Sequence, residues 1–128
     1  MTGGARPSGT DFEYRVRDAL REAGWRAERT MRSAQAGKHV LCDVTAHAGA
    51  CTMLGVECKY SRDRSHKRWI RVDTEEIKEA TRKAGKDRLA ILAVNSKLGP
   101  LFILTKEGTA QLREMIREEW EDGESDRL

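Results

Sequence analysis

The chain has 128 residues, 35% of them charged, and a formal net charge of +3, which is enough for one domain with a modest apolar core. It contains no apolar run of about 18 residues, the length that crosses a membrane, and its amino terminus lacks the apolar segment of a secretory signal. We therefore expect a soluble, cytoplasmic protein with no membrane partner. Three cysteines without CxxC spacing argue against a disulfide framework.

The cysteines also bear on metal binding. A zinc site is conceivable from Cys42, His47, Cys51 and Cys58, but their spacing fits no common zinc knuckle. Thiols that pack as small apolar side chains in strands explain this pattern better.

Charge is distributed unevenly along the chain. Residues 113–128 hold seven acids and three bases. Since the whole chain has 24 bases and 21 acids, residues 1–112 carry 21 bases against 14 acids. Such a basic body is typical of proteins that bind nucleic acid, although many basic surfaces only keep a protein soluble. We divide the chain into a mobile amino-terminal arm at 1–9, one folded domain at 10–121 and an acidic tail at 122–128.

The first predicted element is a helix from about 11 to 23. Apolar residues recur there with the period of one helix face. They are Phe12, Val16, Ala19, Leu20 and Ala23. Thr10 is a suitable N-cap for this helix, and Gly24 is a suitable stop.

Three strands are predicted next. Apolar and polar residues alternate at 25–30, and a loop follows at 33–38. Strands at about 40–46 and 51–60 then form a hairpin through a turn at 48–50.

The second half of the chain predicts two more helices and two more strands. The elements are a basic stretch at 62–71, a helix from Asp73 or Thr74 to Gly85, a strand at 89–94, a strand at 101–104 and a last helix from about Thr109. The run at 89–94 is apolar throughout, as expected of a strand buried on both faces. The order α-β-β-β-α-β-β-α describes a single α/β domain with a mixed sheet.

Charged residues interrupt the apolar pattern of the predicted hairpin. Asp43 lies in the first strand, and Glu57 and Lys59 lie on one face of the second, because their spacing is two. The hairpin brings Asp43 close to Glu57. Carboxylate oxygens suit Mg²⁺, and a nearby lysine can stabilise an anionic transition state, which is the chemistry of phosphodiester hydrolysis. The alternative is an edge strand whose charged face is solvated.

Glu13 is a candidate third carboxylate of this site. It lies at the border of the apolar stripe of the first predicted helix. The alternative is local, because Thr10-x-x-Glu13 is also a capping-box pattern, in which Glu13 would only cap its own helix.

The basic stretch directly follows the charged strand. Its bases are Arg62, Arg64, Lys67, Arg68 and Arg71, with Trp69 among them. Bases next to a hydrolytic site can hold the phosphates of a nucleic acid. The alternative is a solvated loop.

The order of these features resembles the archaeal-type Holliday junction resolvases, also carried by some phages, within the PD-(D/E)xK nuclease superfamily. The resemblance covers roughly residues 9–105. The shared features are a glutamate early in the first helix (Phe12-Glu13-Tyr14-Arg15), Gly24-Trp25, a loop with Arg32-Ser33, the strand of Asp43, Glu57-Cys58-Lys59, and an apolar strand ending in Ala93-Val94.

The resemblance implies a restriction-endonuclease-like domain that acts as a homodimer on four-way DNA junctions. It implies Mg²⁺ as cofactor, with Mn²⁺ able to substitute. By this likeness Glu13, Asp43 and Glu57 are acidic metal-site residues, Lys59 is the catalytic lysine, the Cys58 carbonyl is a further metal ligand and Ser33 acts from its loop. The candidate DNA-binding set joins Arg29, Arg32 and Lys38 to the basic stretch.

Three departures from the family pattern are present. Cys42 precedes Asp43 where relatives usually have proline, and the loop lacks the Ser-Gly pattern, which leaves the role of Ser33 open. Glu75 and Glu76 occur in the second helix where relatives often place a glutamine. Two alternatives therefore stay open, namely a restriction-like or nicking nuclease on duplex DNA, and a basic DNA-binding module without catalysis.

Overall fold

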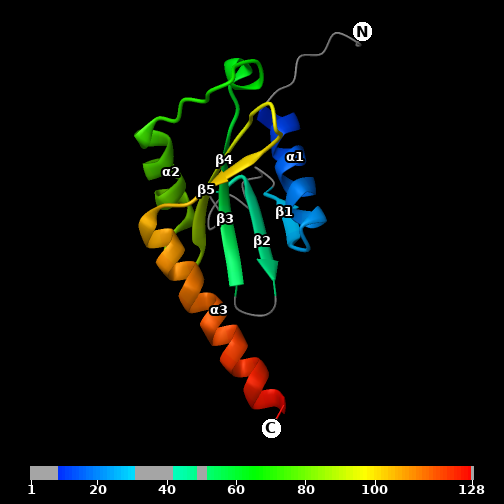
Figure 1. The fold of residues 1–128 in the computed structure, drawn as a ribbon, viewed down its shortest axis with the longest axis vertical. Helices are drawn as coiled ribbons and strands as arrows, with labels where there is room; N and C mark the ends of the chain where they lie inside the picture. Colours follow the sequence, from blue (N-terminus) through cyan, green and yellow to red (C-terminus); the bar gives the residue numbers. More distant parts are fainter. Residues whose placement is uncertain (1–8, 31–41, 49–51, 128) are drawn as a thin grey trace.

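The computed structural model describes residues 9–30, 42–48 and 52–127, with the side chains at 52 and 119–127 not described. These residues form a five-stranded sheet flanked by helices (Figure 1). The elements are α1 (Gly9–Glu22), β1 (Arg26–Arg29), β2 (Val44–Ala48), β3 (Thr52–Lys59), the short 3-10 helix η1 (Arg62–Ser65), α2 (Thr74–Ala84), β4 (Leu89–Val94), β5 (Leu101–Ile103) and α3 (Lys106–Arg127). The predicted order of helices and strands is confirmed.

The sheet is mixed. Its strands lie in the order β1-β2-β3-β4-β5, and β3 and β4 are parallel while the other neighbours are antiparallel. Parallel neighbours need a crossover connection, because a hairpin reverses the chain. Here η1 and α2 make that crossover between β3 and β4. The prediction of a single α/β domain with a mixed sheet is therefore confirmed.

Different helices cover the two faces of the sheet. On one face, Val56 and Ile91 belong to the larger core, which α1 and α3 complete. On the other face, Leu92 and Val94 pack with α2. Because side chains alternate along a strand, Glu57 projects from the opposite side of β3 to Val56, toward α2. Strand β4 contributes buried residues to both faces, as its apolar run predicted.

Helix α1 begins earlier than predicted. It starts at Gly9, so Gly9 is not part of an arm and Thr10 lies inside the helix. The predicted N-cap and the Thr10–Glu13 capping box are therefore wrong. At the other end Gly24 has φ +101°, and its N–H and that of Trp25 donate to carbonyls of the last turn. This is a Schellman ending, so the predicted stop is confirmed.

Two other boundaries differ from the prediction. Strand β2 begins at Val44, so Asp43 lies one residue before the strand. Helix α3 begins at Lys106 because Thr105 is its N-cap, whose hydroxyl accepts from the N–H of Gly108 at 3.0 Å. The helix runs to Arg127, so the residues assigned to an acidic tail continue it. Figure 1 shows its carboxyl half extending past the sheet.

Helix α2 lies very close to β3 at Gly55. A Cβ atom added at Gly55 would lie 3.0 Å from the Cβ and 3.2 Å from the Cα of Ala84. A glycine facing an alanine thus allows the helix to approach the strand that carries Glu57 and Lys59. Of the two residues proposed to begin this helix, Asp73 is the N-cap, and it forms a capping box in which the side chains of Asp73 and Glu76 each accept the other's backbone N–H.

We expect Gly55→Val to lower the free energy of unfolding by about 1–3 kcal/mol, because the added atoms overpack against α2. Urea unfolding followed by circular dichroism measures this change. Gly9→Ala is the matched control, since Gly9 lies in a helix with nothing within 4 Å of an added Cβ. Equal stability of both variants would mean that the close approach of α2 is not a constraint.

Candidate active site

Asp43 is held in place by three hydrogen bonds. Its N–H donates to the carbonyl of Val56 at 3.0 Å, and its own carbonyl accepts from the N–H of Thr30 at 2.9 Å. Its side-chain Oδ2 accepts from the N–H of Cys58 at 2.8 Å. The residue is 8% exposed. The hairpin thus brings Asp43 close to Glu57, as the spacing in the sequence predicted.

Glu57 is a buried carboxylate with unusual partners. It is 1% exposed, its Oε2 accepts from Lys83 Nζ at 2.7 Å, and the same oxygen lies 3.5 Å from Lys59 Nζ. Its Oε1 is buried and has no hydrogen-bond partner among the described residues. Burial raises the pKa of Glu57, nearby Asp43 adds to the rise, and Lys83 opposes it, so that the pKa is about 7. A proton or a cation between the carboxylates of Glu57 and Asp43 would interact favourably with both groups.

Helix α2 contributes two residues that the sequence analysis did not select. Glu79 accepts from Lys59 at 2.9 Å and from Lys83 at 3.0 Å, and Lys83 also contacts Glu57. The four side chains form a chain of alternating charge, which we call the α2 charge cluster: Lys59, Glu79, Lys83 and Glu57. Lys59 and Lys83 lower the pKa of Glu79 to about 2.

A weak signal for these two residues was present in the sequence. Glu79 and Lys83 have the spacing of an i,i+4 ion pair, and each lies next to an alanine of the buried stripe, Ala80 or Ala84. The glutamates considered in their place have other partners. Glu76 binds Arg64 at 2.8 Å, and Glu75 lies 3.2 Å from Lys78 at the surface.

Glu13 is buried, with a partner of its own. It is 6% exposed, and its Oε1 accepts from Arg29 Nε at 2.8 Å. Arg29 also lies over the ring of Tyr14, 4.8 Å from its centroid. Burial is the main cause that raises the pKa of the Cys58 thiol, and the charges of Asp43, Glu13 and Glu57 add to the rise. Metal binding by Glu13 and DNA contact by Arg29 stay predictions.

The donor set fits Mg²⁺. In the described part of the chain, no three acidic, histidine or cysteine side chains gather closely enough to hold an ion by themselves. Mg²⁺ needs only one or two carboxylates, since water and phosphate complete its shell. Asp43 and the orphaned Oε1 of Glu57 meet that need. Burial raises the pKa of Cys42 and of Cys58, and Cys51, a third candidate zinc ligand, lies outside the described residues.

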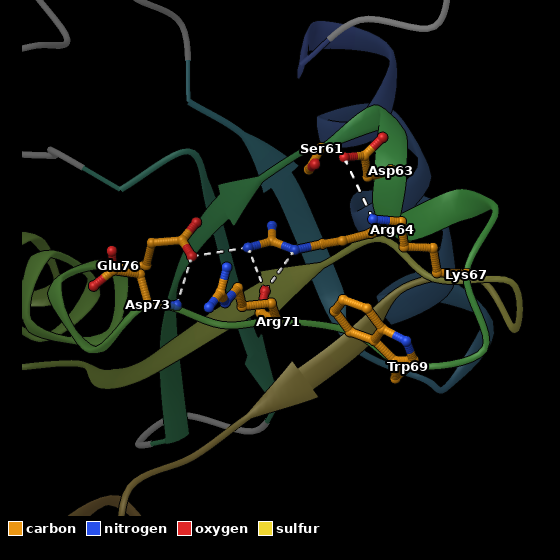
Figure 2. A pocket seen from close by; sticks show the side chains of 8 residues that line it. All are labelled: Ser61, Asp63, Arg64, Lys67, Trp69, Arg71, Asp73 and Glu76. Atoms are coloured by element: carbon orange, nitrogen blue, oxygen red, sulfur yellow. Dashed lines mark hydrogen bonds and ion pairs between the residues drawn. The ribbon is translucent and has the colours of Figure 1, made fainter.

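The basic stretch divides into one internal arginine and several exposed bases. Arg64 donates to the carbonyl of Arg71 at 2.9 and 3.1 Å and to Glu76 at 2.8 Å (Figure 2). It also donates to the carbonyl of Lys59 at 3.2 Å. Its side chain is 10% exposed, so it organises the loop from inside. The exposed bases are Arg62, Lys67, Arg68 and Arg71. Three further candidates, Arg32, Ser33 and Lys38, lie outside the described residues.

The mixed sheet and the acidic pair with its lysine define a domain of the restriction-endonuclease-like class. The family model of the archaeal Holliday junction resolvase (Hjc) matches residues 5–117, and the chain belongs to that family. Membership implies a nuclease that acts on Holliday junctions. No curated protein matches the chain. Among the helices that the structure describes, none has the length and apolarity to cross a membrane.

The raised pKa of Glu57 predicts a pH-dependent stability. Its ordinary value is 4.5 and its folded value is about 7, so the folded state binds the proton more tightly than the unfolded state. The stabilisation is complete below the unfolded pKa and is lost as pH rises through the folded one. In EDTA, we expect Glu57→Gln to gain stability relative to the parent between about pH 5 and pH 8, by up to about 3 kcal/mol.

Urea unfolding at both pH values measures this difference. Glu75→Gln is the matched control, because Glu75 is an exposed carboxylate of α2. If the free energy of unfolding depended on pH in the same way for the parent and for Glu57→Gln, the raised pKa of Glu57 would be contradicted.

Proposed function

We propose that this chain is a Mg²⁺-dependent endodeoxyribonuclease that resolves four-way DNA junctions by paired phosphodiester hydrolysis, as a cytoplasmic homodimer, with Mn²⁺ able to replace Mg²⁺. One observation carries the metal dependence. Glu57 is 1% exposed, and its Oε1, near the carboxylate of Asp43, has no hydrogen-bond partner among the residues that the structure describes. Burying such a group is costly unless a cation or proton satisfies it. Family membership supports the junction as substrate.

Asp43 and Glu57 would hold the metal, and Glu13 would support its ligands. When bound, the metal supplies Lewis-acid stabilisation and an activated water. Asp43 is positioned for this role by its three backbone contacts. Lys83 stabilises the ionised form of Glu57, because its ammonium donates to Oε2 at 2.7 Å. We also propose that the Cys58 carbonyl is a further metal ligand and that Ser33 acts in the site from its loop.

Lys59 acts as a cation in this mechanism. Its hydrogen bond to Glu79 raises its pKa above the ordinary 10.5. The ammonium is therefore protonated at neutral pH and cannot take a proton from water. It remains 30% exposed, so it can donate to a phosphate oxygen and stabilise the charge that develops there. The hydrogen bond to Glu79 orients the Lys59 side chain.

The exposed bases after β3 would hold the DNA backbone. Arg62, Lys67, Arg68 and Arg71 follow Lys59 directly in the chain, and Arg64 ties their loop to the Lys59 carbonyl at 3.2 Å. Phosphate contacts of this kind position DNA without reading its sequence. Contacts of this kind are appropriate for a DNA substrate that is recognised by its branched shape and not by its sequence.

Two alternatives remain and are separable by one assay. A nicking or restriction-like nuclease would cut matched duplex with Mg²⁺, and a non-catalytic DNA-binding module would cut nothing. Labelled four-way junction, duplex and single strand of equal length, each incubated with Mg²⁺ and with EDTA, distinguish all three. The buried carboxylate of the α2 charge cluster favours catalysis, because a module that only binds DNA gains nothing from burying Glu57.

We expect Asp43→Asn, Glu57→Gln and Lys59→Ala each to lower junction cleavage by at least about 10³, with junction affinity within about tenfold of the parent, because each removes charge from the reacting centre only. Single-turnover cleavage and fluorescence anisotropy measure the two quantities. Lys78→Ala is the control for Lys59→Ala, since Lys78 is an exposed lysine of α2. Cleavage near the parent rate in any two of the three variants would remove the site assignment.

Paired incision predicts a dimer. One chain carries one site, and two symmetry-related strands are most simply cut by a twofold pair of subunits. Of the apolar residues in the carboxyl-terminal third, Leu112 and Met115 pack against the larger core. Phe102 and Ile116 are 40% and 57% exposed, which leaves them available to a partner.

Sedimentation equilibrium at micromolar concentration should therefore give roughly twice 14.5 kDa. A monomer that cuts both strands together would refute the symmetric arrangement. A monomer that makes only single nicks would favour the nicking alternative.

A further inference from the structure

Trp69 is exposed in the loop between η1 and α2. It is 62% exposed, although tryptophan is usually well buried. Lys67 Nζ lies 5.0 Å from the centroid of its ring. Figure 2 shows the indole at the side of the loop, away from the contacts of Arg64. A large ring kept at the surface with a cation on its face indicates a contact surface for a ligand.

The ring borders two hollows in the surface. A cavity of about 240 Å³ is lined by Arg64, Lys67, Trp69 and Arg71, among others (Figure 2). A second hollow beside it is lined by Lys67, Arg68 and Trp69. The cavity is smaller than the pockets of roughly 300–1,000 Å³ that hold drug-sized ligands, but it suits one flat ring.

The charges around Trp69 favour a polyanion. The acids that line the cavity already have partners: Glu76 binds Arg64, Asp73 accepts from the N–H of Glu75, and Asp63 lies 3.9 Å from Lys67. Arg68 and Arg71 are exposed beside the ring. An aromatic ring interleaved with exposed bases is the arrangement that binds unpaired nucleotides, since bases stack on the ring and phosphates meet the cations.

The same loop is joined to the proposed active site. Arg64 lines the cavity and donates to the carbonyl of Lys59, the candidate catalytic lysine, at 3.2 Å. Glu76, which also lines the cavity, lies one helical turn before Glu79 on α2. A nucleotide on Trp69 would therefore lie on a loop that Arg64 joins to the backbone of Lys59.

We propose that Trp69 is a stacking platform for an unpaired nucleobase of branched DNA. This inference rests on the proposed function, and it names the residue that distinguishes a branch point from duplex. Bases inside a duplex are stacked on both sides and cannot reach the ring. A base unstacked at a branch point can, while Lys67, Arg68 and Arg71 contact the phosphates next to it.

The first test measures affinity in EDTA by fluorescence anisotropy. Trp69→Ala should weaken binding to a four-way junction with one unpaired nucleotide at the branch point by about five- to 150-fold, and binding to matched duplex by less than about twofold. Trp69→Phe should retain most of the affinity. Leu98→Ala is the control for loss of an exposed apolar side chain, because Leu98 is 89% exposed. An equal loss on junction and duplex, or no loss on either, would overturn the proposal.

The second test has a first readout that uses the parent protein alone. A fluorescent base analogue, 2-aminopurine, is placed either at the unpaired position or inside an arm of the junction. The parent protein should quench the first and leave the second unchanged, and Trp69→Ala should abolish the quenching. An absence of quenching at the unpaired position would overturn the proposal.

The failure of this inference is distinguishable from that of the proposed function. A parent protein that cuts no junction contradicts the proposed function, yet quenching of 2-aminopurine in a single strand would still report stacking on Trp69. Conversely, if the protein resolves junctions but does not quench 2-aminopurine at the unpaired position, only the stacking proposal is contradicted. If Trp69→Ala changes the sedimentation of the DNA-free protein, Trp69 is a contact between protein chains and the proposal falls.

Discussion

The ion pair between Glu57 and Lys83 is the interaction on which the rest of the site depends. Glu57 projects from a strand into the interface with α2 and is 1% exposed. A carboxylate in that position is costly unless a cation meets it. Lys83 meets it at 2.7 Å from a helix whose close approach to the strand is favoured by the glycine at position 55. The packing of α2 against β3 and the ion pair between Lys83 and Glu57 therefore depend on one another.

The same helix orders the remaining charges. Glu79 stands between Lys59 and Lys83, so that like charges are separated and unlike charges are adjacent. Each lysine is held by a carboxylate, and Lys59 keeps its ammonium directed and protonated. A catalytic cation placed in this way needs little reorganisation when charge develops on a substrate, which is the basis of electrostatic catalysis.

Most of the fold and half of the site could be predicted from the sequence. Asp43, Glu57 and Lys59 meet because hairpin register and strand alternation are local consequences of spacing. Glu79 and Lys83 were missed because helical periodicity identifies the buried stripe of α2 but not which strand residue its flank will meet. The inward direction of Arg64 could not be predicted either, since exposed and internal arginines of a basic stretch are identical in sequence. The pairing of Glu13 with Arg29 joins α1 to β1 and is likewise a tertiary property.

Arg64 has a consequence for the entropy of DNA binding. One guanidinium joins the end of β3, the loop at Arg71 and the first turn of α2 through Lys59, Arg71 and Glu76. The loop is therefore fastened to the strand and the helix when they form, by contacts that need no ligand. Its conformational entropy is lost during folding, before any ligand arrives. Less ordering then remains to oppose association, so a few exposed side chains suffice for the loop to act as a preformed surface.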